Sequence, residues 1–122
     1  MANEITLNAT LDYDDAVSSD SLQVTDKHVT VASTIIARHI QSILTSETVI
    51  DLGSVVTMGF VMFKNLDPTN YIEIKSGASG IVIGKMFPGE PYGPVRIGSG
   101  IVAPVAIANS GTCRMDILIT SA

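Results

Sequence analysis

Apolar and polar residues alternate along much of this chain, and an alternation with a period of two predicts half-buried β-strands. The first such run covers residues 5–13, and its apolar positions are Ile5, Leu7, Ala9, Leu11 and Tyr13. The last covers residues 112–120, and the apolar residues expected on its buried face are Cys113, Met115, Ile117 and Ile119. Both runs are typical of strands with one face against a core.

Further strands are expected between these two runs. They cover residues 49–53, 55–64, 71–75, 81–86, 95–97, 101–103 and 105–108. Within 55–64, Gly59 indicates a bulge or close packing. Residues 29–44 are ambiguous, because their apolar spacing fits a helix while their many β-branched residues favour a strand. We expect mainly strand there, and helix stays as the alternative.

Two segments rich in turn formers separate these strands. Asn65–Asn70 combines Asn and Asp side chains, which bond to nearby backbone, with Pro68, which fixes φ. Its position between two predicted strands indicates a hairpin. Phe87–Pro94 contains three prolines and two glycines. We therefore expect a rigid loop there that forms neither a helix nor a ladder strand.

About eight strands, with turn signals every 8–12 residues, predict an all-β fold: an antiparallel β-sandwich of jelly-roll-like type. A chain of 122 residues is expected to form one domain over 1–122, and residues 47–120 have the clearest strand pattern. Residues 14–26 are rich in Ser and Asp, so we expect a polar loop there. It lies within an N-terminal arm or loop region over 1–28 that would order on binding a partner.

The net charge is −5, and the acidic residues gather in the first half of the chain. Residues 1–63 contain eight acids and two bases, whereas residues 64–122 contain four acids and five bases. This balance argues against nucleic-acid binding, which needs bases to neutralise phosphates. It fits a solvated acidic loop or a basic protein partner. No apolar run is long enough to cross a membrane and no secretory signal is visible, so a soluble protein made in the cytoplasm is expected.

Few residues suggest chemistry. His28 and His39 lack the spacing of metal ligands, and we expect them on the surface or on an edge strand. Asp12–Asp15 opens like a calcium loop, but Val17 and Gln23 stand where that loop requires Gly and Glu. A looser carboxylate site for calcium stays as a minor alternative. The single Cys113 excludes an intrachain disulfide, and we expect it to be a small buried apolar residue.

Three other motifs are expected to be coincidental. Gly98–Ala103 matches a dinucleotide fingerprint, but Pro104 prevents the helix that must open there. Gly77–Gly80 is expected to be a turn, and Asn8–Thr10 is a glycosylation sequon that matters only in a secreted protein. We therefore expect no catalytic, cofactor-binding or metal-binding residues, and a protein that is not an enzyme.

Four segments occur in an order that resembles small all-β virion proteins of tailed bacteriophages. They are Phe63–Ile74, with the sequence FKNLDPTNYIEI, then Pro88–Pro91, Val95–Ile97 and Thr112–Ile119. The resemblance covers about residues 47–120 and implies a jelly-roll-like fold. It also implies a role as a capsid decoration (cement) protein. No functional residue carries over, because the shared motifs are turns and strands.

The resemblance implies two partners: the major capsid protein, and the chain itself in a trimer or dimer. The protein would lie in the virion after synthesis in the host cytoplasm, with no cofactor, nucleic acid or membrane partner. The alternatives are another virion position, such as neck, tail or fibre base, and a carbohydrate-binding β-module for host recognition. For the last, Tyr71 and Tyr92 are the candidate aromatic residues.

Overall fold

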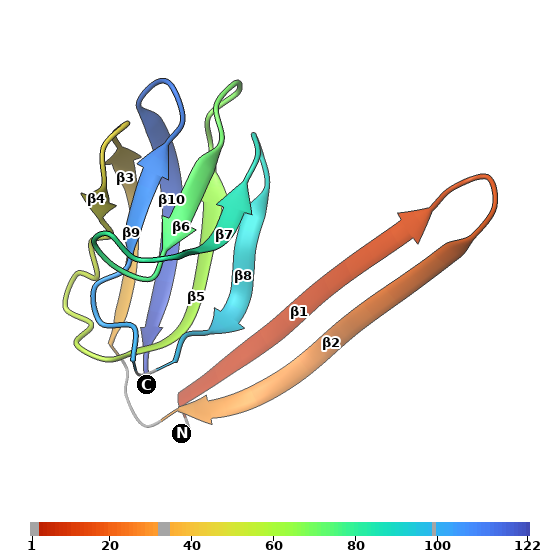
Figure 1. The fold of residues 1–122 in the computed structure, drawn as a ribbon. Helices are drawn as coiled ribbons and strands as arrows, with labels where there is room; N and C mark the ends of the chain where they lie inside the picture. Colours follow the sequence, from red (N-terminus) through yellow and green to blue (C-terminus); the bar gives the residue numbers. More distant parts are fainter. Residues whose placement is uncertain (1–2, 32–34, 99) are drawn as a thin grey trace. The chain divides into compact units, whose positions relative to one another are not determined.

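The computed structural model describes residues 3–31, 35–98 and 100–122, which form antiparallel β-structure (Figure 1). The strands are β1 (Asn3–Asp14), β2 (Ser19–Val31), β3 (Ile36–Ile43), β4 (Thr48–Val49), β5 (Met58–Asn65), β6 (Ile72–Lys75), β7 (Val82–Met86), β8 (Pro91–Arg96), β9 (Val105–Ala108) and β10 (Cys113–Ser121). They belong to two compact units, residues 1–33 and 34–122, where the sequence led us to expect one domain.

The first unit is a long hairpin, in which β1 pairs with β2. The expectation of a polar loop over 14–26 is wrong, because β2 already begins at Ser19 and only a short turn separates the strands. The loop interpretation failed because β2 presents mostly polar side chains, all of them exposed from Ser19 to His28. A strand with so little buried surface has no strong apolar alternation.

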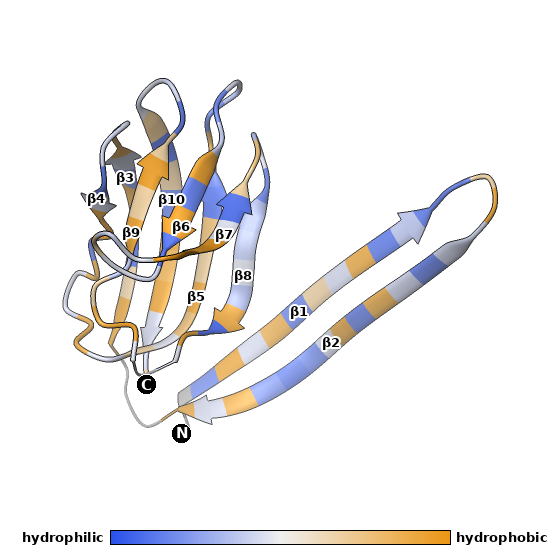
Figure 2. Ribbon diagram, in the orientation of Figure 1, coloured by the Kyte–Doolittle hydropathy of each residue, from blue (hydrophilic) through white to orange (hydrophobic). Residues whose placement is uncertain are grey.

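The second unit is a sandwich of two four-stranded sheets, with the orders β3-β10-β5-β8 and β4-β9-β6-β7. Their inward faces enclose one apolar core, and Figure 2 shows the apolar bands on the strands that surround it. The fully buried members of the core are Ile43, Ile72, Ile74, Met86, Ala106, Cys113, Met115, Ile117 and Ile119. The prediction of an antiparallel β-sandwich is therefore confirmed. The jelly-roll connection pattern stays a prediction.

The ambiguous segment 29–44 contains the end of β2 and the whole of β3, so strand is correct there over helix. In β10, the four residues predicted to share a buried face are all fully buried. Gly59 also behaves as predicted. A Cβ at Gly59 would lie 2.8 Å from the backbone oxygen of Ser121, so the two backbones approach too closely for a side chain.

Asn65–Asn70 does not close a hairpin. It leads from β5 in one sheet to β6 in the other, and β5 pairs with β10 and β8 whereas β6 pairs with β9 and β7. Turn-forming residues indicate that the chain changes direction, but they do not determine which strands pair across the turn. The segment is a crossover between the two layers.

The expectation that Phe87–Pro94 excludes a ladder strand is also wrong, because β8 begins at Pro91. β8 is an edge strand that pairs only with β5, and proline is tolerated at an edge because its missing N–H leaves no ladder bond unmade. Gly93 has a φ of +97°, and a Cβ there would lie 2.4 Å from the backbone oxygen of Val61. Residues 101–103, expected as a strand, form a turn and bend that lead into β9.

Candidate functional site

The strand register of the hairpin sorts its residues onto two faces, because directly paired residues of antiparallel strands point to the same side. Leu11 is paired with Leu22, and Ile5 with Val29. The apolar residues of one face, which we call the apolar face of the hairpin, are Ile5, Leu7, Ala9, Leu11, Tyr13, Leu22, Val24 and Val29, and it also carries Asp20 and Lys27, the partners of Tyr13 and Leu7. Figure 2 shows apolar bands that alternate with polar ones along β1 and β2. The hairpin is thus an amphipathic two-stranded sheet.

Much of this apolar face is exposed. The accessible fraction is 74% for Leu11 and 73% for Leu22, and these two residues line a shallow depression together with Tyr13. Covering a side chain of this kind is worth about 1.5–3 kcal/mol. A lone two-stranded hairpin is only marginally stable in water. The hairpin therefore combines low stability of its own with an exposed apolar face.

The opposite face of the hairpin and its turn are polar. Ser21 donates a hydrogen bond of 2.6 Å to Asp12, and His28 lies 2.5 Å from Glu4. In the turn, Asp15 accepts bonds of 2.7 Å from the backbone N–H groups of Val17 and Ser18. The Tyr13 hydroxyl, followed by these two amides, lowers the pKa of Asp15. The aspartates of this region thus shape the turn and keep one face solvated.

The hairpin carries the net charge of the chain. Residues 1–33 contain six acids and one base, Lys27, which gives −5. Residues 34–122 contain six acids and six bases, which gives zero. The charge asymmetry visible in the sequence therefore belongs to one structural unit.

A second surface of mixed character is the outward face of the sheet β3-β10-β5-β8, which we call the outer sheet face. Its members are Ile36, Arg38, Ile40, Phe60, Met62, Lys64, Arg96, Arg114, Asp116 and Leu118. Arg38 forms an ion pair with Asp116, and the Arg96 guanidinium lies 4.3 Å from the centre of the Phe60 ring. Four bases and one acid give this face a charge of +3. Its centre is a shallow depression that includes Met62 and Leu118.

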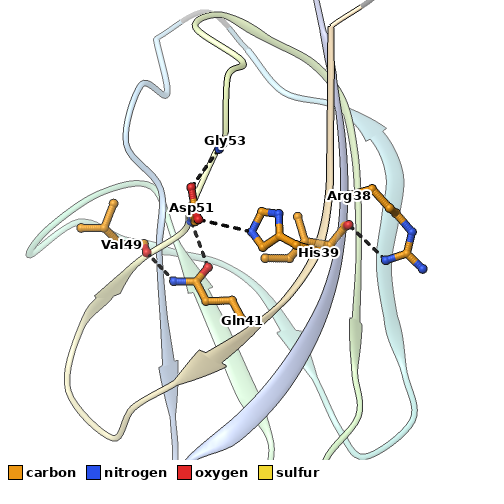
Figure 3. Close-up of polar contacts among 7 residues, drawn as sticks. Arg38, His39, Gln41, Val49, Asp51 and Gly53 are labelled. Carbon is orange, nitrogen blue, oxygen red and sulfur yellow. Dashed lines mark hydrogen bonds and ion pairs between the residues drawn. The ribbon is translucent and has the colours of Figure 1, made fainter.

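The polar cluster around His39 resembles a catalytic pair only at first sight (Figure 3). His39 Nε2 is buried without a hydrogen bond and lies 3.8 Å from Asp51 Oδ2. The side-chain amide of Gln41 donates a hydrogen bond of 2.8 Å to the backbone oxygen of Val49. It also accepts a hydrogen bond of 2.9 Å from the backbone N–H of Asp51. No side chain drawn in this cluster is a nucleophile. The arrangement fastens the segment after β4 to the edge strand β3.

The two aromatic candidates for sugar binding do not present free ring faces. Tyr92 is half-buried and stacks on Phe63, with ring centroids 6.1 Å apart. The Lys85 ammonium lies 3.9 Å from the centre of the Tyr71 ring. The Phe87 ring packs edge-on against the Tyr71 ring, with the two ring centroids 5.8 Å apart. Sugars stack on open aromatic faces, so these contacts count against a carbohydrate-binding role.

The other sequence candidates lie apart from one another. His28 is exposed on β2 and His39 lies on the edge strand β3, as expected, while Cys113 is fully buried. In residues 3–31, 35–98 and 100–122, no group of three or more His, Cys, Asp or Glu side chains could hold a metal ion. Gly77–Gly80 is a turn closed by a hydrogen bond of 2.9 Å, and Gly98 accepts one of 3.0 Å from Ile101. Ser99 lies outside the described residues.

Comparisons with protein-family models, with curated proteins and with solved structures found no match to this chain. Over the residues that the structure describes, no helix is long and apolar enough to span a membrane.

Sequence reasoning missed the second strand of the hairpin and, with it, the apolar face as a continuous surface. A signal was present. Leu22 and Val24 have the spacing of one strand face, and an Asp15–Ser18 turn places them opposite Leu11 and Ala9. The outer sheet face was hidden because it depends on which strands are neighbours.

Proposed function

We propose that this chain is a structural assembly protein, specifically a decoration (cement) protein of a tailed-phage capsid. The observation that carries the proposal is the amphipathic hairpin, whose apolar face is exposed. A monomer gains nothing from keeping leucines such as Leu11 and Leu22 in water, whereas an assembly gains the free energy of covering them.

The hairpin has the reach that a clamp needs. β1 has 12 residues, and at about 3.3 Å per residue it extends about 40 Å. Such a length can span from one protein subunit to the next. The sandwich supplies a rigid body. One edge of each sheet disfavours uncontrolled pairing, because β8 contains Pro91 and Pro94 and β4 has only two residues.

The chemistry of the described residues supports a binding role over catalysis. Two His–carboxylate pairs are present, His39 with Asp51 at 3.8 Å and His28 with Glu4 at 2.5 Å. The second has the Thr6 hydroxyl 3.2 Å from His28, but all three side chains lie on an exposed face of the hairpin that does not enclose a substrate. The depressions on the surface are shallow and open, whereas substrate sites usually enclose most of their ligand. The resemblance of Phe63–Ile74 and the later motifs to phage virion proteins supplies the capsid part of the proposal.

Co-sedimentation with undecorated capsids from the same source tests this function. We expect binding that saturates at a fixed number of copies per capsid subunit. The double variant Leu11→Ser/Leu22→Ser should bind at least about tenfold more weakly, since it loses two buried side chains. A matched control is Thr10→Ser/Gln23→Ser, a paired position on the polar face, and it should bind like the parent chain. Absent or non-saturating binding by the parent chain would refute the cement role.

A neck, tail or fibre-base position would use the same hairpin. Electron microscopy of virions labelled through this protein separates these positions, because a cement protein marks the whole shell.

A further inference from the structure

Two surfaces of this chain complement each other in charge and in apolar character. The hairpin has a charge of −5 and an apolar face that includes Leu11 and Leu22. The outer sheet face has a charge of +3 and exposes Met62 and Leu118 at its centre. We infer that the hairpin of one copy packs its apolar face on the outer sheet face of a second copy. This inference rests on the proposed function, for which it names the partner that builds the decorating oligomer.

The apolar parts of the two surfaces have matching form. Both are faces of antiparallel sheets, and such faces pack about 10 Å apart with their side chains interdigitated. Leu11 and Leu22 are direct register partners in the hairpin, and Met62 and Leu118 are direct register partners in the sheet. Each surface therefore offers a pair of long apolar side chains side by side, and both pairs are at least about two-fifths exposed.

The charges on the two surfaces favour this contact. Arg38, Lys64, Arg96 and Arg114 surround the apolar centre of the sheet face, and only Asp116 opposes them. Among the acids of the hairpin, Asp20 lies on the apolar face, and the others lie on the opposite face or at the turn and the bulge. Screening over about 8 Å in physiological salt weakens their effect at the contact, so the opposite net charges guide the approach of the two surfaces. Two hairpins would repel each other, which disfavours hairpin-to-hairpin pairing.

The surface area buried between two copies is large enough for a stable dimer if each copy packs its hairpin on the other. One hairpin face is about 40 Å long and about 10 Å wide, so it covers about 400 Å². In a two-fold symmetric pair, each copy gives one hairpin and receives one. Four such faces amount to about 1,600 Å², the usual size of a stable protein interface. A single one-way contact would be only half that size.

Complementation between two variants tests the inference. The first variant, Leu11→Ser/Leu22→Ser, has an impaired hairpin and an intact sheet face. The second, Met62→Ser/Leu118→Ser, has the reverse. Because all four side chains are exposed, both variants should keep their β-structure by circular dichroism. We expect the parent chain to show at least twice its 12.8 kDa mass by light scattering, and each variant alone to show one chain mass. A mixture of the two should form mixed dimers with one intact contact, because the intact hairpin of one meets the intact sheet face of the other. These mixed dimers should dissociate more readily than the parent dimer but less readily than a dimer of either variant alone.

Raised salt should weaken the parent oligomer, and Thr10→Ser/Gln23→Ser should leave it unchanged. A monomeric parent chain overturns the inference, as do variants that remain oligomeric or a mixture that associates no more than each variant alone. The two proposals can fail separately. A monomeric chain that still binds capsids to saturation refutes only this inference. An oligomer formed through the hairpin that does not bind capsids refutes only the cement role.

Discussion

The side-chain amide of Asn65 donates a hydrogen bond of 3.1 Å to the backbone oxygen of Met86, and this bond joins the two sheets of the sandwich. Asn65 ends β5 in one sheet, and Met86 ends β7 in the other. The same side-chain amide donates a second hydrogen bond, of 2.8 Å, to the backbone oxygen of Asn70. Its oxygen accepts a hydrogen bond of 2.9 Å from the backbone N–H of Asp67. One fully buried side chain thus organises the whole crossover between the layers.

Replacing Asn65 with alanine should destabilise the sandwich by about 1–3 kcal/mol, because the carbonyls of Asn70 and Met86 lose their donor in a buried place. Urea unfolding followed by circular dichroism measures this change. Thr69→Ala is the control, since Thr69 is exposed in the same crossover and only its backbone is used. A loss below about 0.5 kcal/mol for the Asn65 variant would show that water replaces the amide.

Gly59→Ala should cost about 1–3 kcal/mol, because the new methyl group would meet the backbone of β10 and backbone cannot move aside. Gly98→Ala serves as the comparison, since a Cβ there has no neighbour within 4 Å. It should leave the free energy of unfolding within about 0.5 kcal/mol of the parent value. Equal stability of the two variants in thermal unfolding would contradict the close approach of β5 and β10.

Asp67 should make the sandwich sensitive to acid. Hydrogen bonds from the backbone amides of Asn70 and Thr69 lower the pKa of Asp67 from its ordinary value of 3.8. A lowered pKa in the folded state stabilises the fold at pH values above the ordinary one, and this contribution is lost as the pH falls through the folded value. The stability difference between the parent chain and Asp67→Ala should therefore be largest near neutral pH and vanish in strong acid. A difference that is constant from about pH 7 to about pH 2 would contradict this.

Cys113 should be inert to thiol reagents in the folded protein. Burial, followed by the nearby charge of Asp67, raises the pKa of this thiol, and the reactive species is the thiolate. We expect a disulfide reagent to label Cys113 at least about a hundredfold more slowly in native buffer than in guanidinium chloride. Equal rates would show that β10 opens readily.

The strand pattern predicted the sandwich well wherever a strand has one face in the core. The buried residues of β10 and the close approach at Gly59 both follow from local features of the sequence. Strand pairing was less predictable, because Asn65–Asn70 marks a change of direction equally well in a hairpin and in a crossover. Only the end of β8 was predicted, as a strand over 95–97. Its start at Pro91 was missed because proline is excluded only from central strands, and edge position is not a local property.

The candidate site was mostly hidden for a related reason. β2 has no core to face, so selection for burial leaves little apolar signal in it, and its Ser and Asp residues resemble a loop. The acidic character of the first half was visible, and we interpreted it as a solvated loop or a surface for a basic partner. Its structural meaning needed the pairing of Leu11 with Leu22, which creates one continuous apolar face.

Hydrogen exchange of the backbone amides in β1 and β2 tests whether another protein surface covers the hairpin. If the apolar face is a docking surface, amides such as those of Leu11 and Leu22 should be protected, because a covered hairpin rarely opens. The protection should increase with protein concentration or on binding to capsids, and Leu11→Ser/Leu22→Ser should abolish it. Exchange of the whole hairpin within seconds at every concentration, with and without capsids, would contradict the assembly role.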